Sequence, residues 1–322
     1  MQASMAEKAP EKILIIVLRA IGDVLLTTPL VRALKKGLPG SEIYFLTEKT
    51  SEEILSSNPY LSGVILKDDY TLKNIRSRGF DTVIDFMHSA ISGYYTLFSG
   101  ARRRIAFYRP WGFWCYNSMP KYRDLGYTVN NRLQILSELG VKADGISPDM
   151  KFGPENEKRA AEFLARNGVN GGDFAISFDI TSKRDYKSWP CEKFARLADT
   201  IADRTGAKLI FTYAPNEAEY VKNAMAVCRR KHILSFPTGL ADLAALIKHC
   251  KLHIGTSSAP GHIAVSQGVP TFTIYGMKTN PVNWSFPDAE KHGYIQGSLG
   301  SLSVEAAAGA LFDFIDLSGI RA

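Results

Sequence analysis

Several signatures of redox, metal-binding and membrane-spanning proteins are missing from this sequence. No C-x-x-C pair occurs and the cysteines are widely scattered, so we expect buried free thiols rather than disulfides or a zinc site. The polar start MQASMAEKAP lacks the apolar core of a signal peptide, and the longest early apolar run, residues 13–18, is far too short to cross a bilayer. We therefore expect a cytoplasmic protein, with contact at the inner face of the membrane left open. The cysteines are Cys115, Cys191, Cys228 and Cys250.

Common catalytic motifs are missing as well. The first apolar segment is not followed by G-x-G-x-x-G, which argues against a dinucleotide dehydrogenase, and the absence of G-x-x-x-x-G-K-[ST] argues against a P-loop NTPase. There is no H-E-x-x-H, no G-x-S-x-G and no D-x-D pair of the kind that holds a metal on a diphosphate. The sequence therefore predicts a site that works without a metal or a tightly bound cofactor.

The composition is that of a globular protein with material for two cores. The 322 residues are 45% apolar and 22% charged, and their net charge is +7. This positive balance favours anionic partners such as nucleotides, phosphorylated sugars or acidic lipids, without choosing among them.

Apolar segments of strand length alternate with amphipathic segments of helix length. KILIIVL, EIYFLT, SGVIL and DTVIDF read as strands, with a helix over residues 24–36, and a second series runs from DFAISF to VPTFTIYG. Between the two series, residues 141–156 are rich in Gly, Pro and Asp and read as a linker. We predict two doubly wound α/β domains, residues 1–150 and 151–322. Ligands of such sheets bind beyond the carboxyl ends of the strands.

Two loops of the second domain have the composition of phosphate sites. The loop at residues 177–190 contains Thr181, Ser182 and Lys187, whose hydroxyl and ammonium groups suit phosphate oxygens, although a solvated basic loop would look the same. In GTSSAPGH, Ser257 and Ser258 precede a helix whose N-terminus would attract an anion. The alternative here is an ordinary N-cap, and His262 alone reads more readily as a capping or core histidine.

In the first domain, Asp23 is the single carboxylate of LRAIGDVLLTTPLVRALKKGLPG. Its position alone favours an N-cap of the following helix.

Residues 102–123 hold six basic residues, seven aromatic ones and no acidic one. This composition suits an anionic, partly apolar acceptor at a membrane surface. It also fits a platform for single-stranded nucleic acid. The third interpretation is that the aromatic side chains fill the core of the domain while the basic ones are solvated.

Taken in order, the motifs resemble glycosyltransferase family 9, the ADP-heptose:lipopolysaccharide heptosyltransferases. R-x-x-G-D-x-x-x-x-x-P begins at Arg19, K-x-W-P begins at Lys187, and G-T-x-S-x-x-x-H-x-A, beginning at Gly255, is followed by G-V-P and YG. The resemblance spans about residues 12–287. It implies a GT-B fold, two Rossmann-like domains that bind the acceptor mainly by the first and the nucleotide-sugar by the second. The terminal helix, about residues 302–317, often crosses back onto the first domain in such folds.

The resemblance also assigns roles. An inverting, metal-independent transfer is implied, in which Asp23 is the catalytic base, helped by an apolar wall from Ile21, Val24 and Leu25 that would raise its pKa. Glu217 corresponds to a carboxylate that binds the nucleotide ribose, although a first-turn Glu would also suit that helix. The expected donor-binding residues are Thr181, Ser182, Lys187, Glu217, Ser257, Ser258, Ala259 and His262, and the expected acceptor-binding residues are Arg19, Arg102, Arg103 and Arg104.

The chain departs from the family where many members read G-T-D-S-G. Ser257 stands in place of an aspartate and Ala259 in place of a glycine. Three interpretations follow: heptose transfer from an ADP-sugar to a cell-envelope glycan, the same fold with another nucleotide-sugar, or a binding protein that has lost turnover.

Overall fold

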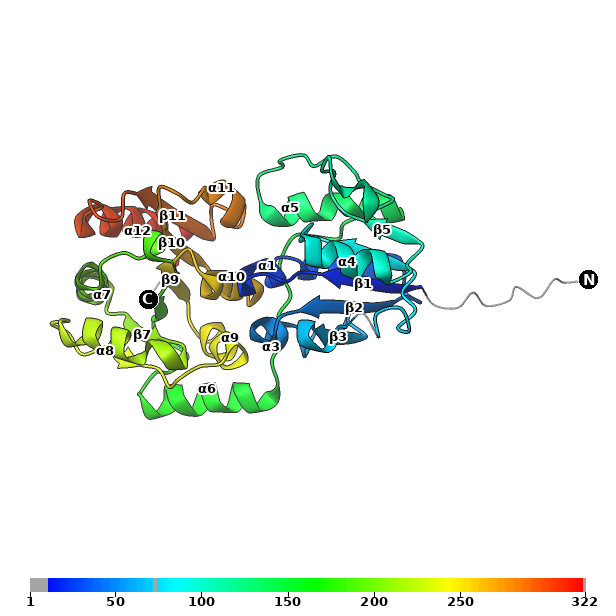
Figure 1. Cartoon of the computed structure of the whole chain (residues 1–322). Helices are drawn as coiled ribbons and strands as arrows, with labels where there is room; N and C mark the ends of the chain where they lie inside the picture. Colours follow the sequence, from blue (N-terminus) through cyan, green and yellow to red (C-terminus); the bar gives the residue numbers. More distant parts are fainter. Residues whose placement is uncertain (1–10, 72–73, 183, 321–322) are drawn as a thin grey trace, which may run out of the picture. The chain divides into compact units, whose positions relative to one another are not determined.

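The computed structural model describes residues 11–71, 74–182 and 184–320 of the chain, which forms two compact units (Figure 1). The first unit comprises Met1–Leu125 and Val129–Ile146, and the second comprises Gly126–Thr128 and Ser147–Ala322. Each is built on one parallel sheet with helices, so the predicted α/β fold with two doubly wound domains is confirmed. Within the described residues no helix is both long enough and apolar enough to cross a membrane, and all four cysteines are free.

The first unit contains a five-stranded sheet whose strand order reverses at its centre. The order is β3-β2-β1-β4-β5, and every neighbouring pair is parallel. Residues 13–16 of β1 are fully buried, as expected for a central strand covered on both faces. The order changes direction between β1 and β4, which is where sheets of this kind bind ligands. The strands are β1 (Lys12–Ile16), β2 (Glu42–Thr47), β3 (Gly63–Leu66), β4 (Thr82–Asp85) and β5 (Arg103–Ile105).

The single helix predicted over residues 24–36 is two helices. Pro29 has no N–H to donate to the carbonyl of Leu25, and the Thr28 hydroxyl donates to that carbonyl instead, at 2.7 Å. The helix therefore breaks between α1 (Ile21–Leu25) and α2 (Thr28–Gly37). The other helices are α3 (Glu52–Leu55), α4 (Ala90–Phe98) and α5 (Thr128–Leu133), with 3₁₀ turns at Lys49–Ser51, Lys67–Asp69, Gly112–Trp114 and Gln134–Leu139.

The second unit repeats this design with six parallel strands. The order is β11-β10-β9-β6-β7-β8, and it reverses between β9 and β6, where Asp179 lies opposite Gly255. The edge strands β8 and β11, which the sequence analysis did not predict, extend the sheet on both sides. The strands are β6 (Ala175–Asp179), β7 (Lys208–Thr212), β8 (Ile233–Leu234), β9 (Leu252–Thr256), β10 (Thr271–Gly276) and β11 (His292–Gly297).

The helices of the second unit include one within the predicted linker. α6 (Pro154–Arg166) begins inside residues 141–156, because Pro154 suits a first helical position and the Asn156 side chain accepts from the Gly153 N–H. At the other end, α12 (Val304–Ser318) packs on α7, β10 and β11, where a Cβ on Gly293 would lie 2.5 Å from the Phe314 ring. Its return to the first domain stays a prediction. The remaining helices are α7 (Cys191–Thr205), α8 (Ala218–Ala226), α9 (Leu240–Lys248), α10 (Ala259–Ser266) and α11 (Pro281–Trp284), with 3₁₀ turns at Asp185–Lys187 and Pro215–Glu217.

Candidate active site

In the first unit, Asp23 lies in α1, directly beyond the carboxyl end of β1. The N-cap of α1 is Ala20, and Asp23 is the third residue of the helix. The interpretation of Asp23 as an N-cap is therefore wrong. Arg19 is exposed in the same loop, and its contact with an acceptor stays a prediction.

The partner of Asp23 is a guanidinium group. Arg132 Nη2 lies 2.5 Å from Asp23 Oδ1, and Nη1 of the same side chain donates to the Asp23 carbonyl and to the Thr27 hydroxyl. The side chains of Asp23 and Arg132 are only 16% and 10% exposed. Arg132 thus contacts the side chain of Asp23 through Oδ1.

The apolar wall expected around Asp23 is not its main neighbour. Val24 and Leu25 point into the core and are fully buried, whereas the carboxylate faces Arg132. The guanidinium itself lies over the Phe86 ring, 5.7 Å from its centroid. The surroundings of Asp23 are thus a charge pair resting on an aromatic ring, which fixes the direction of the carboxylate.

Three of the four arginines predicted to bind the acceptor, Arg102, Arg103 and Arg104, are not brought to Asp23. Arg103 is in register with Thr82, which is in register with Ile13, so Arg102 and Arg103 belong to the edge of the sheet where the strands begin. Asp23 lies beyond the opposite edge, and each intervening strand residue adds about 3.3 Å. Arg104 donates to the carbonyls of Cys115 and Ala101, which is a structural use.

The second unit contains a carboxylate that the sequence analysis did not single out. Asp179 is the last residue of β6 and is buried. Its Oδ1 accepts from the N–H and the hydroxyl of Thr181 at 3.1 and 2.9 Å, and its Oδ2 accepts from the Ser258 hydroxyl at 2.7 Å. Burial raises its pKa to about 6, against the hydrogen bonds, which lower it. Asp179 therefore joins the loops that follow β6 and β9.

Lys187 reaches from the first of these loops to the second. Its Nζ lies 3.2 Å from the carbonyl oxygen of Ser257 and 3.5 Å from the Ser257 hydroxyl, and 5.8 Å from the Trp284 ring centroid. The Thr256 hydroxyl also donates to the Thr181 carbonyl, at 2.8 Å. The structure thus brings together residues predicted from two separate motifs.

The N-terminus of α10 lacks the cap that its sequence suggests. Ser258 occupies the N-cap position, but its hydroxyl donates to Asp179 and accepts no bond from the first turn. Ala259 begins the helix, and the positive end of its dipole is directed toward the Ser257 loop. The ordinary capping interpretation is therefore wrong for the Ser258 side chain.

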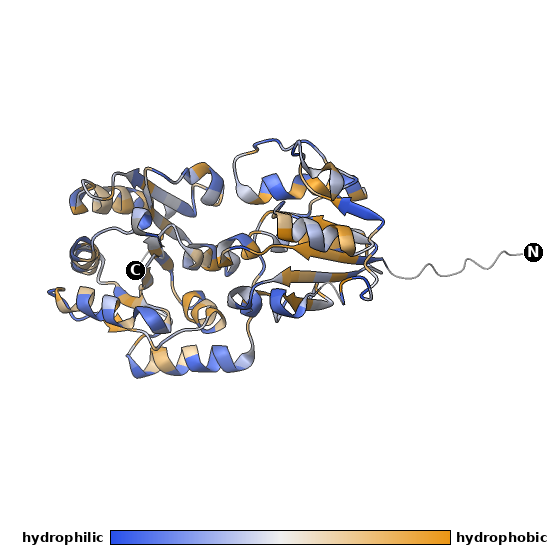
Figure 2. Cartoon of the chain, viewed as in Figure 1, coloured by the Kyte–Doolittle hydropathy of each residue, from blue (hydrophilic) through white to orange (hydrophobic). Residues whose placement is uncertain are grey.

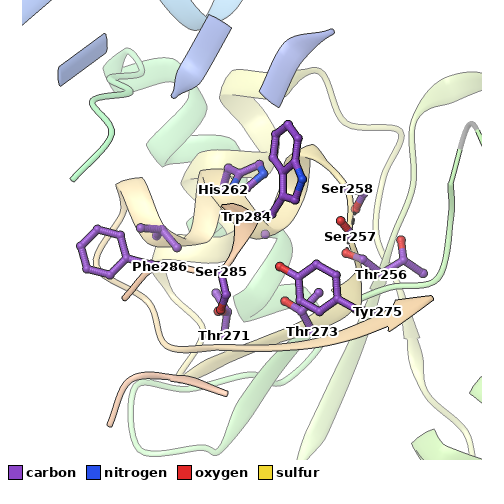
Figure 3. A pocket seen from close by; sticks show the side chains of 12 residues that line it. Thr256, Ser257, Ser258, His262, Thr271, Thr273, Tyr275, Trp284, Ser285 and Phe286 are labelled. Atoms are coloured by element: carbon purple, nitrogen blue, oxygen red, sulfur yellow. Dashed lines mark hydrogen bonds between the residues drawn. The ribbon is translucent and has the colours of Figure 1, made fainter. Parts of the chain in front are cut away.

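A narrow cavity adjoins this helix end (Figure 3). It measures about 10 Å³, enough for one water molecule. His262 lies on its wall with its ring 6.1 Å from that of Trp284, and Tyr275 lines it from β10. Tyr275 and Trp284 were missed because aromatic residues in such segments usually indicate only core packing.

Glu217 and Ser182 complete the predicted donor residues. Glu217 Oε2 accepts from the Ala214 N–H and from the Thr181 hydroxyl, both at 3.0 Å, so it caps its own turn and also reaches the loop after β6. Ser182 is half-buried in that loop and its hydroxyl donates to the Arg184 carbonyl. Their contacts with a nucleotide or diphosphate stay predictions.

Comparisons with known proteins identify the family and the fold. The model of glycosyltransferase family 9 (heptosyltransferase) matches residues 71–301. Lipopolysaccharide heptosyltransferase 3 of Escherichia coli K12 is 28% identical over 289 residues, and the match covers 83% of each protein. A solved glycosyl transferase of family 9 from Veillonella parvula matches with a TM-score of 0.83 and 24% identity, over 95% of this chain and 97% of its own. E. coli heptosyltransferase WaaC, solved with ADP, matches with a TM-score of 0.75 and 18% identity, over 96% and 99%.

Proposed function

Since the family model matches more than half of it, the chain belongs to glycosyltransferase family 9, and we propose that it is an inverting heptosyltransferase that uses an ADP-heptose donor. It has the GT-B fold and is a glycosyltransferase. Its proposed acceptor is a sugar of the lipopolysaccharide core or of another cell-envelope glycan, because a relative named as a lipopolysaccharide heptosyltransferase covers most of its length. The proposed site of action is the cytoplasm, at the inner face of the cytoplasmic membrane.

The observation that carries the proposal is the convergence of two loops at the switch point of the second sheet. Lys187 lies against Ser257, and the N-terminus of α10 has no cap from the Ser258 side chain. A departing nucleoside diphosphate needs compensation for its charge, and an ammonium group with a helix dipole offers it. We propose that these groups suffice without a metal ion or cofactor.

In the proposed reaction, Asp23 Oδ2 takes the proton of the acceptor hydroxyl while the hydroxyl oxygen bonds to the anomeric carbon of the donor. The bond from that carbon to the diphosphate oxygen breaks at the opposite face, and the leaving diphosphate takes the electron pair. Inversion of the anomeric centre follows from this direction of attack. Arg132 does not donate or accept the proton in this scheme, and it orients Asp23.

The test is calorimetric titration of the purified protein with ADP, UDP and GDP in the presence of EDTA. We expect ADP to bind at least tenfold more tightly than the other two. A preference for UDP or GDP would favour another donor, which the serine at position 257 already suggests as the second candidate. Binding that requires added Mg²⁺ would reject the metal-independent scheme. If ADP binds but no free ADP is released from ADP-heptose and a heptose-deficient lipopolysaccharide core, the protein is a binding protein.

A further inference from the structure

The helix α4 has its large apolar residues on the outside. Ser92, Gly93 and Thr96 are buried against the first unit, whereas Ile91, Tyr94, Leu97 and Phe98 are exposed. The Tyr94 and Phe98 rings are stacked, with centroids 6.0 Å apart. A surface helix ordinarily buries its large apolar side chains and exposes small and polar ones. In this helix the four large apolar side chains named above are exposed instead, so within the described residues they cover little of the protein's own apolar surface.

The segment at residues 107–125 adds a second set of exposed aromatic side chains. Trp114 is 73% exposed and Phe113 is 58% exposed, and their rings contact each other with centroids 4.8 Å apart. The interpretation of these aromatics as core residues is correct for Tyr116, which is buried, and wrong for the exposed majority. The exposed aromatic side chains of this segment are Tyr108, Trp111, Phe113, Trp114 and Tyr122.

Buried contacts hold this segment in place beside α4. The Tyr116 hydroxyl donates to Asp85 at the end of β4, at 2.5 Å. A Cβ on Gly112 would lie 2.6 Å from His88 Nε2, and one on Gly93 would lie 3.0 Å from Cys115 Sγ. Buried contacts therefore hold the backbone that carries the exposed rings, and α4 packs directly against this segment.

We call the exposed large apolar residues at positions 91–125 the aromatic surface; they belong to α4 and to the segment packed beside it, where Gly93 lies near Cys115. Among the described residues of the first unit, every exposed large apolar side chain belongs to this range. Figure 2, viewed as Figure 1 and coloured by hydropathy, shows orange, apolar stretches on α4. A concentration of this kind on one part of a unit marks an interaction surface.

The charge of the same segment indicates what the partner is. Residues 102–123 contain no acidic side chain, and exposed basic ones stand among the aromatic ones. The Arg109 guanidinium lies 5.9 Å from the Trp111 ring centroid, and Asn117 Nδ2 donates to the Arg102 carbonyl, which ties the segment to the basic start of β5. Asp68, beside Ile91, and Asp124 stand at the margins. The exposed basic residues are Arg102, Arg103, Arg109, Lys121 and Arg123.

We propose that the aromatic surface docks the enzyme on an anionic phospholipid bilayer. Tryptophan and tyrosine rings suit the headgroup region, where one end of the ring is apolar and the other is wet. Arginine and lysine side chains contact lipid phosphates while their stems cover apolar surface. Binding to lipid needs no sugar, so it can be tested independently of the transferase reaction. Only its role, bringing the enzyme to a lipid-anchored acceptor, rests on the proposed function.

The experiment is flotation of the full chain with vesicles of phosphatidylglycerol and phosphatidylcholine that contain no glycolipid. We expect binding that rises with the phosphatidylglycerol fraction and falls with salt. Phe113→Ser/Trp114→Ser and Tyr94→Ser/Phe98→Ser should each weaken it at least tenfold. The matched control is Tyr220→Ser/Val227→Ser, which removes exposed apolar side chains from the second unit and should leave binding unchanged.

Fluorescence distinguishes insertion from simple charge attraction. The chain has four tryptophans, and brominated lipids should quench the wild type strongly. Trp111→Phe/Trp114→Phe, which keeps Trp189 and Trp284, should show little quenching.

Equal binding of the two aromatic variants and the control variant would overturn the proposal. So would a dimer of the wild type that the aromatic variants convert to monomers, which would identify a second copy of the chain as the partner, or a preference for single-stranded RNA over vesicles. ADP titration of the same variants separates the proposals, because loss of docking leaves ADP affinity unchanged, and failure of the donor proposal leaves docking unchanged.

Discussion

The two sheets each place a carboxylate at the switch point, and the two carboxylates differ in every physical respect. Asp23 follows β1, is 16% exposed and is paired with Arg132. Asp179 ends β6, is fully buried and is bound by hydroxyl and N–H groups of Thr181 and Ser258. A carboxylate that faces outward on a fixed partner is suited to taking a proton from a substrate. One that is enclosed by the protein's own donors is suited to holding loops in place.

Position beyond a strand end therefore does not by itself identify a catalytic residue. The first edge carries a charge pair of Asp23 with Arg132. The second edge carries an ammonium group, hydroxyls and a helix end, which are suited to recognising negative charge rather than to moving protons. Substitutions at the two edges should therefore act on different kinetic constants.

The largest effect is expected for Asp23→Asn. The amide keeps the shape and can still accept from Arg132, but it cannot take a proton, so kcat should fall about 10³-fold. ADP affinity, measured by calorimetry, should stay within twofold because Asp23 belongs to the other unit. Turnover within tenfold of the wild type would mean that Asp23 only orients Arg132.

The next effect is expected for Lys187→Met, which removes the ammonium group near Ser257 but retains an unbranched side chain. Loss of one group that stabilises the leaving diphosphate should lower kcat about 10²-fold and weaken ADP binding as well. Lys222→Met is the matched control, since it makes the same change of charge at an exposed position of α8. If both variants behave alike, Lys187 acts only through the overall charge of the protein.

The alternation of strands and helices could be predicted from the sequence, because apolar periodicity identifies central strands and most helices. It failed where tertiary contacts decide. β8 and β11 are short edge strands, and Gly293 in β11 serves the approach of Phe314 rather than strand propensity. α4 was not predicted, since its nine residues are mostly apolar and give little amphipathic periodicity.

The candidate site divides in the same way. Lys187, Ser257 and Ser258 could be predicted because local composition suggests phosphate binding, and the structure brings them together. Arg132 could not be predicted, because 109 positions separate it from Asp23. Asp179 reads as one polar residue at a strand end, and its partner Ser258 lies 79 positions away.

The smallest effect is expected for Asp179→Asn, the substitution that tests the structural role assigned to the second carboxylate. The amide has one acceptor where the carboxylate has two, so the loops after β6 and β9 should loosen and the KM for the ADP-sugar should rise roughly tenfold with little change in kcat. In the wild type, protonation of Asp179 below its pKa of about 6 imposes a similar loss, so affinity for an ADP-sugar should fall as pH drops through 6. The phosphates of an ADP-sugar stay singly ionised over this range, so the variant should lack this dependence.

The contribution of Asp179 to the free energy of unfolding should change with pH in the direction opposite to the change in ADP-sugar affinity. The folded-state pKa of Asp179 is raised from 3.8 to about 6, so the folded protein binds more protons than the unfolded one in this window, and the contribution of Asp179 to stability falls as pH rises. Complete removal of that charge is worth at most about 3 kcal/mol. The urea midpoint of Asp179→Asn, relative to the wild type, should therefore be higher at pH 8 than at pH 4. If the difference in urea midpoint between the variant and the wild type is the same at pH 4 and pH 8, burial does not raise the pKa of Asp179. The proposed contrast between Asp179 and Asp23 would then be wrong.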